Sequence, residues 1–236
     1  MRGNGPRRRL LADAAVLQKF PGYSARVVYG YGLLNAESGG ESSEILEAAE
    51  AEARRLFAGL AVAEHPHIDA WRSAYGAFGA KPSKFLCSAE SLLRRVLKGE
   101  PLPRINRIVD TYNAVSLRHV LPAGGEDLDR LEGDLHLAFA TGAEPFDGAD
   151  PASSDARPNP GEVVWKDPAG VTCRRWNWRQ CRRTRLVPET LNAYFVLDRL
   201  APYPLATLDA ATEELCAHLQ RLSPACEIEV DSLGAR

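Results

Sequence analysis

Two stretches of the sequence combine side chains that could do chemistry, and their charges are opposite. Residues 110–134 (DTYNAVSLRHVLPAGGEDLDRLEGD) carry a cluster of carboxylates that follows a Pro-Ala-Gly-Gly sequence. Residues 173–185 (CRRWNWRQCRRTR) carry arginines around two tryptophans. Carboxylates can orient water or accept protons, whereas arginine and tryptophan bind anions and aromatic rings. We therefore expect the two stretches to face each other across a polar pocket.

The arginine-rich stretch has two interpretations that the residues leave open. If residues 174–185 are extended, alternate side chains share a face, and the guanidinium groups need carboxylates, phosphates or water as partners. The acid-rich residues 126–134 are the obvious internal partner, which would make the contact a structural ion-pair network. The alternative is a pocket floor that binds a charged or nucleotide ligand.

Familiar catalytic and metal-binding motifs are absent from the sequence. It contains no G-x-S-x-G, G-x-x-x-x-G-K, G-x-G-x-x-G or H-E-x-x-H pattern. Neighbouring arginines could lower the thiol pKa of Cys181, but no histidine lies nearby in the sequence, so we do not expect a catalytic cysteine. The five cysteines and five histidines are scattered, and we expect no metal and no cofactor.

The composition is typical of a globular protein. The chain has 236 residues, 45% of them hydrophobic and 25% charged, and a net charge of −2. No apolar run approaches the roughly 20 residues that span a bilayer, and no signal-peptide pattern follows the basic start, so we expect a cytoplasmic protein without a membrane partner. Residues 1–9 are predicted to be a disordered basic tail and residues 10–236 a single domain.

Hydrophobic periodicity and turn residues predict a mixed α/β protein. Helices are expected at 42–60, capped by Ser42 or Ser43, and at 67–78, 89–97 with a Ser88 cap, 105–121 and 207–222. Strands are expected at 25–34, 135–140, 162–165, 171–178 and, along a sheet edge, 226–230. Residues 191–200 could form a strand or a short helix, 122–125 a turn, and 142–161 a long loop inserted between strands.

A basic segment surrounds the helix expected at 89–97. It contains Lys81, Lys84, Arg94, Arg95 and Lys98. A solvated helix face explains these charges without any partner. A surface that contacts phosphate groups is the alternative, and these five side chains would then carry it.

Three strings, DTYNAVSL, LPAGGEDLDRLEGD and RRWNWRQ, resemble free-standing proteins of the B3/B4 domain family, and the likeness covers roughly residues 71–200. That domain is the tRNA-binding and editing module in the β subunit of phenylalanine–tRNA ligase. The resemblance implies a layered fold, with a central sheet sandwich flanked by helices and a pocket between its two halves. It also implies the aminoacylated 3′ end of tRNA as partner and ester hydrolysis as the reaction, without activation of amino acids by ATP.

Some residues match the ligase module and others depart from it. The shared positions are Asp110, Asn113, Leu128, Asp129, Gly133, Glu189, Thr190 and Asn192. Gly124 stands where the ligase pattern has a histidine, and Gln180-Cys181-Arg182 falls where a Gly-Gly-Glu reads tyrosine. The opposite charge at Arg182 favours a different amino acid, polar or acidic, over tyrosine.

The functional hypothesis is an RNA-binding trans-editing hydrolase that deacylates a mischarged tRNA. Glu126 or Asp127 would orient the water, with backbone amides of Gly124 and Gly125 as donors to the oxyanion. The other expected substrate contacts are Asn113, Arg175, Asn177, Arg179 and Arg182, with Trp176 stacked on adenine. Two alternatives remain: a module that binds tRNA or an amino-acid-like ligand without cleaving it, and a purely structural domain.

Overall fold

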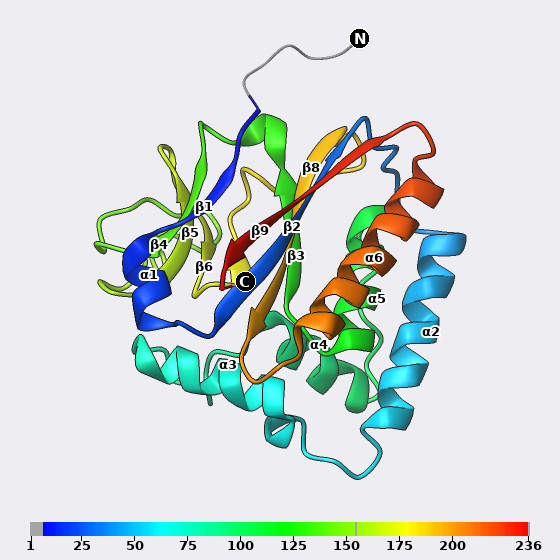
Figure 1. Ribbon diagram of the computed structural model, residues 1–236, viewed down its shortest axis with the longest axis horizontal. Helices are drawn as coiled ribbons and strands as arrows, with labels where there is room; N and C mark the ends of the chain where they lie inside the picture. Colours follow the sequence, from blue (N-terminus) through cyan, green and yellow to red (C-terminus); the bar gives the residue numbers. More distant parts are fainter. Residues whose placement is uncertain (1–6, 154, 236) are drawn as a thin grey trace.

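A computed structural model describes residues 7–153 and 155–235 and contains two β-sheets with helices packed around them (Figure 1). The first sheet has the order β1-β4-β5-β6-β7 and the second β3-β8-β2-β9. The first consists of β1 (Leu10–Ala12), β4 (Leu135–Phe139), β5 (Val163–Asp167), β6 (Gly170–Arg174) and β7 (Arg179–Gln180). The second consists of β2 (Tyr23–Tyr31), β3 (Ala123–Asp127), β8 (Asn192–Leu200) and β9 (Glu227–Gly234). The predicted layered α/β architecture is confirmed.

The helices α5 and α6 cover the face of the second sheet that points away from the first, and α2 lies outside them (Figure 1). Each helix predicted from periodicity is present, with boundaries shifted by a few residues, and α1 was not predicted. The helices are α1 (Ala14–Lys19), α2 (Glu41–Leu56), α3 (Pro66–Ala77), α4 (Ser88–Leu97), α5 (Arg107–His119) and α6 (Leu205–Leu222).

Strand β8 divides the hydrophobic core into two layers. Phe195 and Leu197 pack with α5 and α6, whereas Tyr194 and Val196 belong to the core between the two sheets. Successive side chains of a strand point to opposite faces, so both faces of a central strand must be apolar. This burial on both faces explains why the sequence of β8 could also be interpreted as a short helix.

Strand β3 replaces the turn that was expected at residues 122–125. Its residues pair with β8, with Gly124 opposite Val196 and Gly125 opposite Phe195. A Cβ on Gly125 would lie 2.6 Å from Phe195 Cδ1 and 2.7 Å from the Tyr194 carbonyl oxygen. Gly125 therefore lets the strand approach β8 closely, and the prediction of a turn was wrong because this glycine is needed for a close strand contact.

Replacing Gly125 by alanine should destabilise the fold. Overpacking of this kind costs about 1–3 kcal/mol, because the added methyl group meets both a ring and the backbone of β8. Gly124→Ala is the matched control, since its Cβ would meet only Gln180 Nε2 at 3.7 Å. Urea denaturation of both variants should show a loss for Gly125→Ala alone. Equal stability would mean that β3 moves away from β8 without cost.

The strand expected to run from 171 to 178 ends at Arg174. Arg175 and Trp176 have positive φ angles of 47° and 65°, and residues 175–178 turn the chain back into β7. The turn buries the Trp176 indole completely against Tyr23, with ring centroids 4.9 Å apart, and against Trp71 at 5.1 Å. Burial of that ring outweighs the cost of two unfavourable backbone conformations. The predicted alternation of side chains along 174–185 is therefore wrong.

Both ends of the described chain pair with strands. Arg9 donates its amide to Asp134 Oδ1 at 2.8 Å, and Arg7 forms ion pairs with Glu227 and Glu229 of β9. Residues 7–9 are therefore held by these contacts, residues 1–6 lie outside the described residues, and the disordered tail over residues 1–9 stays a prediction. The predicted edge strand at the C-terminal end is confirmed as β9. The single domain over residues 10–236 stays a prediction.

Two predicted helix caps were misplaced by one or more residues. Gly40, not a serine, is the N-cap of α2, and the Ser42 hydroxyl donates to the Gly39 carbonyl at 3.1 Å. Helix α4 begins at Ser88 itself, with Cys87 as its N-cap. The Ser88 hydroxyl is thereby left free of a capping role, and it lines the cavity described next.

Candidate functional site

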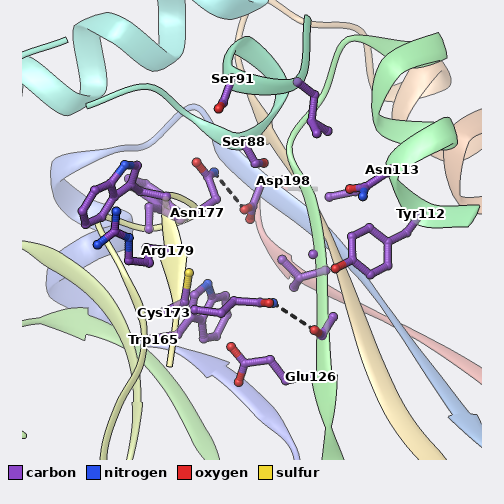
Figure 2. A pocket seen from close by; sticks show the side chains of 18 of the residues that line it. Ser88, Ser91, Tyr112, Asn113, Glu126, Trp165, Cys173, Asn177, Arg179 and Asp198 are labelled. Carbon is purple, nitrogen blue, oxygen red and sulfur yellow. Dashed lines mark hydrogen bonds between the residues drawn. The ribbon is translucent and has the colours of Figure 1, made fainter. Parts of the chain in front are cut away.

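A cavity of about 260 Å³ lies between the two sheets, with α4 and α5 above it in the view of Figure 2. The lining side chains come from every layer of the fold. They are Ser88, Ser91 and Leu92 of α4; Tyr112 and Asn113 of α5; Ala123–Glu126 of β3; Trp165 of β5; Cys173 of β6; Trp176–Gln180; and Tyr194, Val196 and Asp198 of β8. Ser91 and Arg179 are exposed and mark the mouth, whereas Glu126 and Trp165 are buried and mark the closed end.

Strand alternation places the polar groups of β3 and β8 in this cavity. Tyr194, Val196 and Asp198 are separated by two residues each and project from one face of β8. Gly124 and Glu126 project from the same face of the neighbouring β3. Since Gly124 has no side chain, the space beside Glu126 stays open. The two-residue period thus gives the cavity two carboxyl groups from adjacent strands.

Asp198 is the only acid of strand β8, most of whose side chains are buried. It is 1% exposed, and its carboxylate accepts hydrogen bonds from the Tyr23 hydroxyl at 2.9 Å and from Asn177 Nδ2 at 3.1 Å. Burial raises its pKa to about 7, against the two hydrogen bonds, which lower the pKa. Near neutral pH this carboxyl can therefore both accept and return a proton.

The raised pKa of Asp198 predicts how the stability of the protein depends on pH. Between an unfolded pKa of 3.8 and a folded pKa of about 7, the folded state binds more protons, so the free energy of unfolding falls as pH rises. Asp198→Asn should remove this contribution and be more stable than the wild type by about 2–4 kcal/mol at pH 8, with no gain at pH 4. After the substitution, the Asn177 side chain can flip so that its oxygen accepts from the new asparagine. Its NH2 group can then donate to the Tyr75 hydroxyl, which can accept as well as donate.

Urea denaturation at pH 4 and pH 8 measures this difference. The raised pKa of Glu126 also makes the free energy of unfolding fall as pH rises. The free energy of unfolding of Asp198→Asn should therefore still depend on pH, but less steeply than that of the wild type. Parallel curves for the variant and the wild type would contradict the prediction.

Glu126 is the second buried carboxyl group of the cavity. It is 1% exposed, and its Oε2 accepts a hydrogen bond from the Thr184 hydroxyl at 2.9 Å. Its other oxygen, Oε1, is buried without a hydrogen-bond partner. Burial raises the pKa of Glu126 to about 7, and the Thr184 hydroxyl opposes that shift. Figure 2 shows Glu126 at the end of the cavity away from Ser88 and Ser91, with Asp198 between them beside Asn177.

The backbone of Gly125 faces the open edge of the second sheet. In an antiparallel pair, only every second residue forms hydrogen bonds to the neighbouring strand. The Asp198 amide donates to the Pro122 carbonyl at 2.9 Å, so Gly124, two residues later, also bonds to β8. The N–H and C=O groups of Gly125 therefore point away from β8. Its carbonyl accepts from Gln180 Nε2 at 2.9 Å across the cavity. The amide of Gly125 is consequently the better oxyanion donor of the two that the sequence predicted.

An aromatic ring between two arginines stands at the mouth. Arg175 and Arg179 each place a guanidinium carbon 4.3 Å from the Trp178 ring centroid. Trp178 also meets Phe85 edge-on, with centroids 5.2 Å apart. It is partly buried, whereas Trp176 is fully buried, so Trp178 is the more accessible of the two rings.

The structure brings most of the predicted site residues together. Those that line the cavity are Asn113, Gly124, Gly125, Glu126, Trp176, Asn177 and Arg179. Trp176, however, is enclosed by aromatic rings in the core, so the predicted stacking on adenine is wrong.

Three predicted site residues do not line the cavity. Asp127 is buried with Thr190, whose hydroxyl donates at 2.8 Å, and caps the short helix of residues 128–130, so it holds the chain and not a water. Arg182 is exposed, and its amide donates to Asp147 Oδ1 at 2.7 Å. The Arg175 guanidinium lies over Phe85 with its charge paired outside the cavity.

The buried arginines are paired, but with acids other than the predicted ones. Glu162 accepts two hydrogen bonds from Arg174, at 2.8 and 2.6 Å, and one from the Arg175 amide at 3.0 Å. Arg175 also pairs with Asp155 at 2.9 Å. These acids come from the end of the 142–161 loop and the residue that follows it. The ion-pair network therefore exists beside the cavity, and residues 126–134 do not supply it.

Sequence reasoning missed several residues of the cavity, above all Asp198, Trp178, Tyr112 and Tyr194. One signal could have identified Asp198. In LNAYFVLDRL it is the only acid in a strand that is apolar on both faces, and it shares a two-residue period with Tyr194. An acid at such a position must face either a partner or a cavity.

The predicted tRNA-binding side chains are all exposed and belong to α4 or to the segments next to it. Lys81 and Lys84 precede α4, Arg94 and Arg95 lie in its last turn, and Lys98 is its C-cap. Arg94 pairs with Glu90 at 2.8 Å, and Arg95 lies 3.9 Å from Glu100. Because α4 also supplies Ser88 and Ser91, this basic surface adjoins the mouth of the cavity.

Two further features concern metals and membranes. Within residues 7–153 and 155–235, no group of three or more His, Cys, Asp or Glu side chains is arranged to hold a metal ion. The helices of the same residues include none with the length and hydrophobicity to cross a membrane.

Comparison with known proteins identifies the family. The B3/4 domain matches residues 70–217, and the chain belongs to this family, as its motifs predicted. A search of curated proteins gave no match. Among solved structures, an N-terminal fragment of the phenylalanyl-tRNA synthetase β-subunit from Pyrococcus horikoshii is similar, with 12% identity and a TM-score of 0.45. The match covers 94% of this chain and 50% of that one, so the chain spans about half of the fragment's length.

Proposed function

We propose that the protein binds aminoacylated tRNA and hydrolyses the ester that joins a wrongly attached amino acid to it. The observation that carries this proposal is a cavity with two buried carboxyl groups and a free backbone amide. Its family includes a module of phenylalanine–tRNA ligase, which supports tRNA as the partner. A cavity of this size also argues against a purely structural domain.

The geometry suits hydrolysis of an activated ester. The terminal ribose would lie at the mouth, so the ester carbonyl meets the carboxyl nearer the mouth, which is Asp198 (Figure 2). An ionised Asp198 takes a proton from a water as its oxygen bonds to the carbonyl carbon, and the Gly125 amide stabilises the oxyanion. The carbon–oxygen bond to the ribose then breaks, and Asp198 returns the proton to the ribose oxygen. Glu126, predicted from the sequence to orient the water, would instead meet the amino-acid side chain.

The mouth and its surroundings suit a single-stranded 3′ end. Trp178 offers a ring for base stacking, with the exposed Arg179 beside it for a phosphate. The basic surface around α4 would then bind the phosphates of the acceptor stem.

The combined variant Lys81→Ala/Lys98→Ala tests this surface. We expect weaker tRNA binding and a slope of log Kd against log salt concentration that is less steep by about 2, because each lysine that neutralises a phosphate contributes about 1. Fluorescence anisotropy with labelled tRNA between about 50 and 200 mM salt measures the slope. Lys19→Ala in α1, an exposed lysine on a helix that contributes nothing to the cavity, is the control. An unchanged slope in the double variant would place the tRNA elsewhere.

A deacylation screen tests the function itself. The full chain is incubated with tRNAs that carry different mismatched amino acids, and release of free amino acid is followed in each case. We expect release from one amino-acid class, and none with Asp198→Asn. No release from any substrate by a protein that still binds tRNA would overturn the hydrolase.

That outcome would favour the second candidate, a module that binds tRNA or an amino-acid-like ligand without cleaving it. One observation supports it: in the part of the chain that the structure describes, none of the five histidines lines the cavity. The ligase pattern has a histidine at the position of Gly124. Without it, Glu126 and Asp198 are the candidates for a general base among the described lining residues.

A further inference from the structure

The cavity has an unbalanced charge. Glu126 and Asp198 are both buried in it, and neither forms an ion pair with any residue in 7–153 or 155–235. The neighbouring guanidinium groups are already neutralised by other acids. Arg174 pairs with Glu162 at 2.6 Å, Arg175 with Asp155 at 2.9 Å, and Arg183 with Asp167 at 2.7 Å. Arg179 is the only basic side chain among the described lining residues, and it is exposed at the mouth.

The closed end of the cavity presents a free acceptor. Glu126 Oε1 is buried without a hydrogen-bond partner, although the hydroxyls of Tyr194 and Thr172 lie near enough to lower the pKa of Glu126. An ammonium group is a stronger donor to a carboxylate than either of these hydroxyls, so a ligand that supplies one can stabilise this oxygen by a charge-assisted hydrogen bond.

The walls around this acceptor are aromatic. Trp165, Tyr112 and Tyr194 line the same space and are almost fully buried. The faces of such rings attract cations, and a carboxylate with aromatic neighbours is a common arrangement for binding an organic ammonium group. Anions are disfavoured there by the two acids.

We infer that the cavity selects a ligand whose inner end is a primary ammonium group bound by Glu126, so that lysine-like amino acids are its preferred class. Where the ligand is an aminoacyl group, the inference rests on the proposed function. Of the polar or acidic amino acid expected from Arg182, the inference retains the polar class and rejects the acidic one, because the Arg182 side chain lies outside the cavity and the buried groups are acids. Glu126 is in this role a specificity residue that contacts the substrate side chain.

Isothermal titration calorimetry of the full chain with two free ligands tests the inference. L-Lysinamide and L-norleucinamide share the backbone and the four-carbon chain and differ in the ε-ammonium group. We expect lysinamide to bind about 10- to 100-fold more tightly, the range for a buried hydrogen bond to a charged group. Glu126→Gln should reduce the ratio to about threefold or less, because a neutral amide replaces the carboxylate. The matched control is Glu132→Gln, an exposed acid of the same segment, which should leave the ratio unchanged.

Each contrary outcome is clear. Equal or tighter binding of norleucinamide, no measurable binding of lysinamide at millimolar concentration, or a ratio unaffected by Glu126→Gln would overturn the inference. The wild-type comparison needs no variant, so a misfolded Glu126→Gln would not obscure it.

The experiment also separates this inference from the hydrolase. A lysinamide preference without deacylation of any tRNA would retain the ammonium site and reject the hydrolase. Deacylation of a mischarged tRNA by a protein that shows no lysinamide preference would do the reverse.

Discussion

Asp198→Asn should reduce deacylation by about 10²- to 10⁴-fold in kcat, the usual contribution of a general base. Asparagine keeps the size of the side chain and can still accept from the Tyr23 hydroxyl, but it cannot take a proton from water. In the wild type, kcat/KM should rise with pH through about 7, because the carboxyl must be ionised and burial raises its pKa to about that value. Single-turnover release of amino acid from a mischarged tRNA measures both effects.

The same variant should be more stable at pH 8 than the wild type, so lost activity would not reflect unfolding. Such a trade-off between stability and activity is common where an active site buries a charge. Asp69→Asn, which changes an exposed acid on α3, is the control and should retain full activity. If Asp198→Asn retains activity and Glu126→Gln loses it at every substrate, the base is Glu126 and the two roles are exchanged.

Glu162→Gln should destabilise the folded protein by about 3–5 kcal/mol, the loss expected when one partner of a buried ion pair is removed. Glu162 is 2% exposed and accepts from Arg174 Nε at 2.8 Å and Nη2 at 2.6 Å. The fully buried Arg174 guanidinium would then face an amide that can accept only one of these bonds. Urea denaturation at pH 7 gives the difference in the free energy of unfolding.

Two further variants sharpen this test. Glu132→Gln, on the surface, should change stability by less than about 0.5 kcal/mol. The double variant Glu162→Leu/Arg174→Met should recover most of the loss, because apolar side chains of similar volume remove both buried charges. A loss below about 1 kcal/mol for Glu162→Gln would show that the network contributes little to the fold.

Local patterns predicted the helices well and the strands less well. The helices of residues 66–77, 88–97, 107–119 and 205–222 follow from apolar spacing, because each buries one stripe of its surface. Strand β1 was missed because three residues carry too little pattern. Strand β3 was taken for a turn because glycine is as frequent in turns as it is at close strand contacts, and only the ring of Phe195 distinguishes the two.

The candidate site was predicted in its location and only partly in its residues. Residues 110–134 and 173–185 do contribute to one cavity, and Glu126, Asn177 and Arg179 line it. Asp198 was missed because residues 191–200 could be a strand or a short helix, so the two-residue period that it shares with Tyr194 was not recognised.

The acid-rich and arginine-rich stretches, with their glycines and tryptophans, were sufficient to identify the family and to predict a pocket, since residue types and their order are written in the sequence. Which acid meets which arginine depended on the tertiary structure. The Trp176 ring had to be buried, and the turn that buries it sends Arg174 and Arg175 toward Glu162 and Asp155. That pairing leaves Glu126 and Asp198 without an ion-pair partner in residues 7–153 and 155–235, because strand pairing fixes the face of each side chain and residue order alone does not.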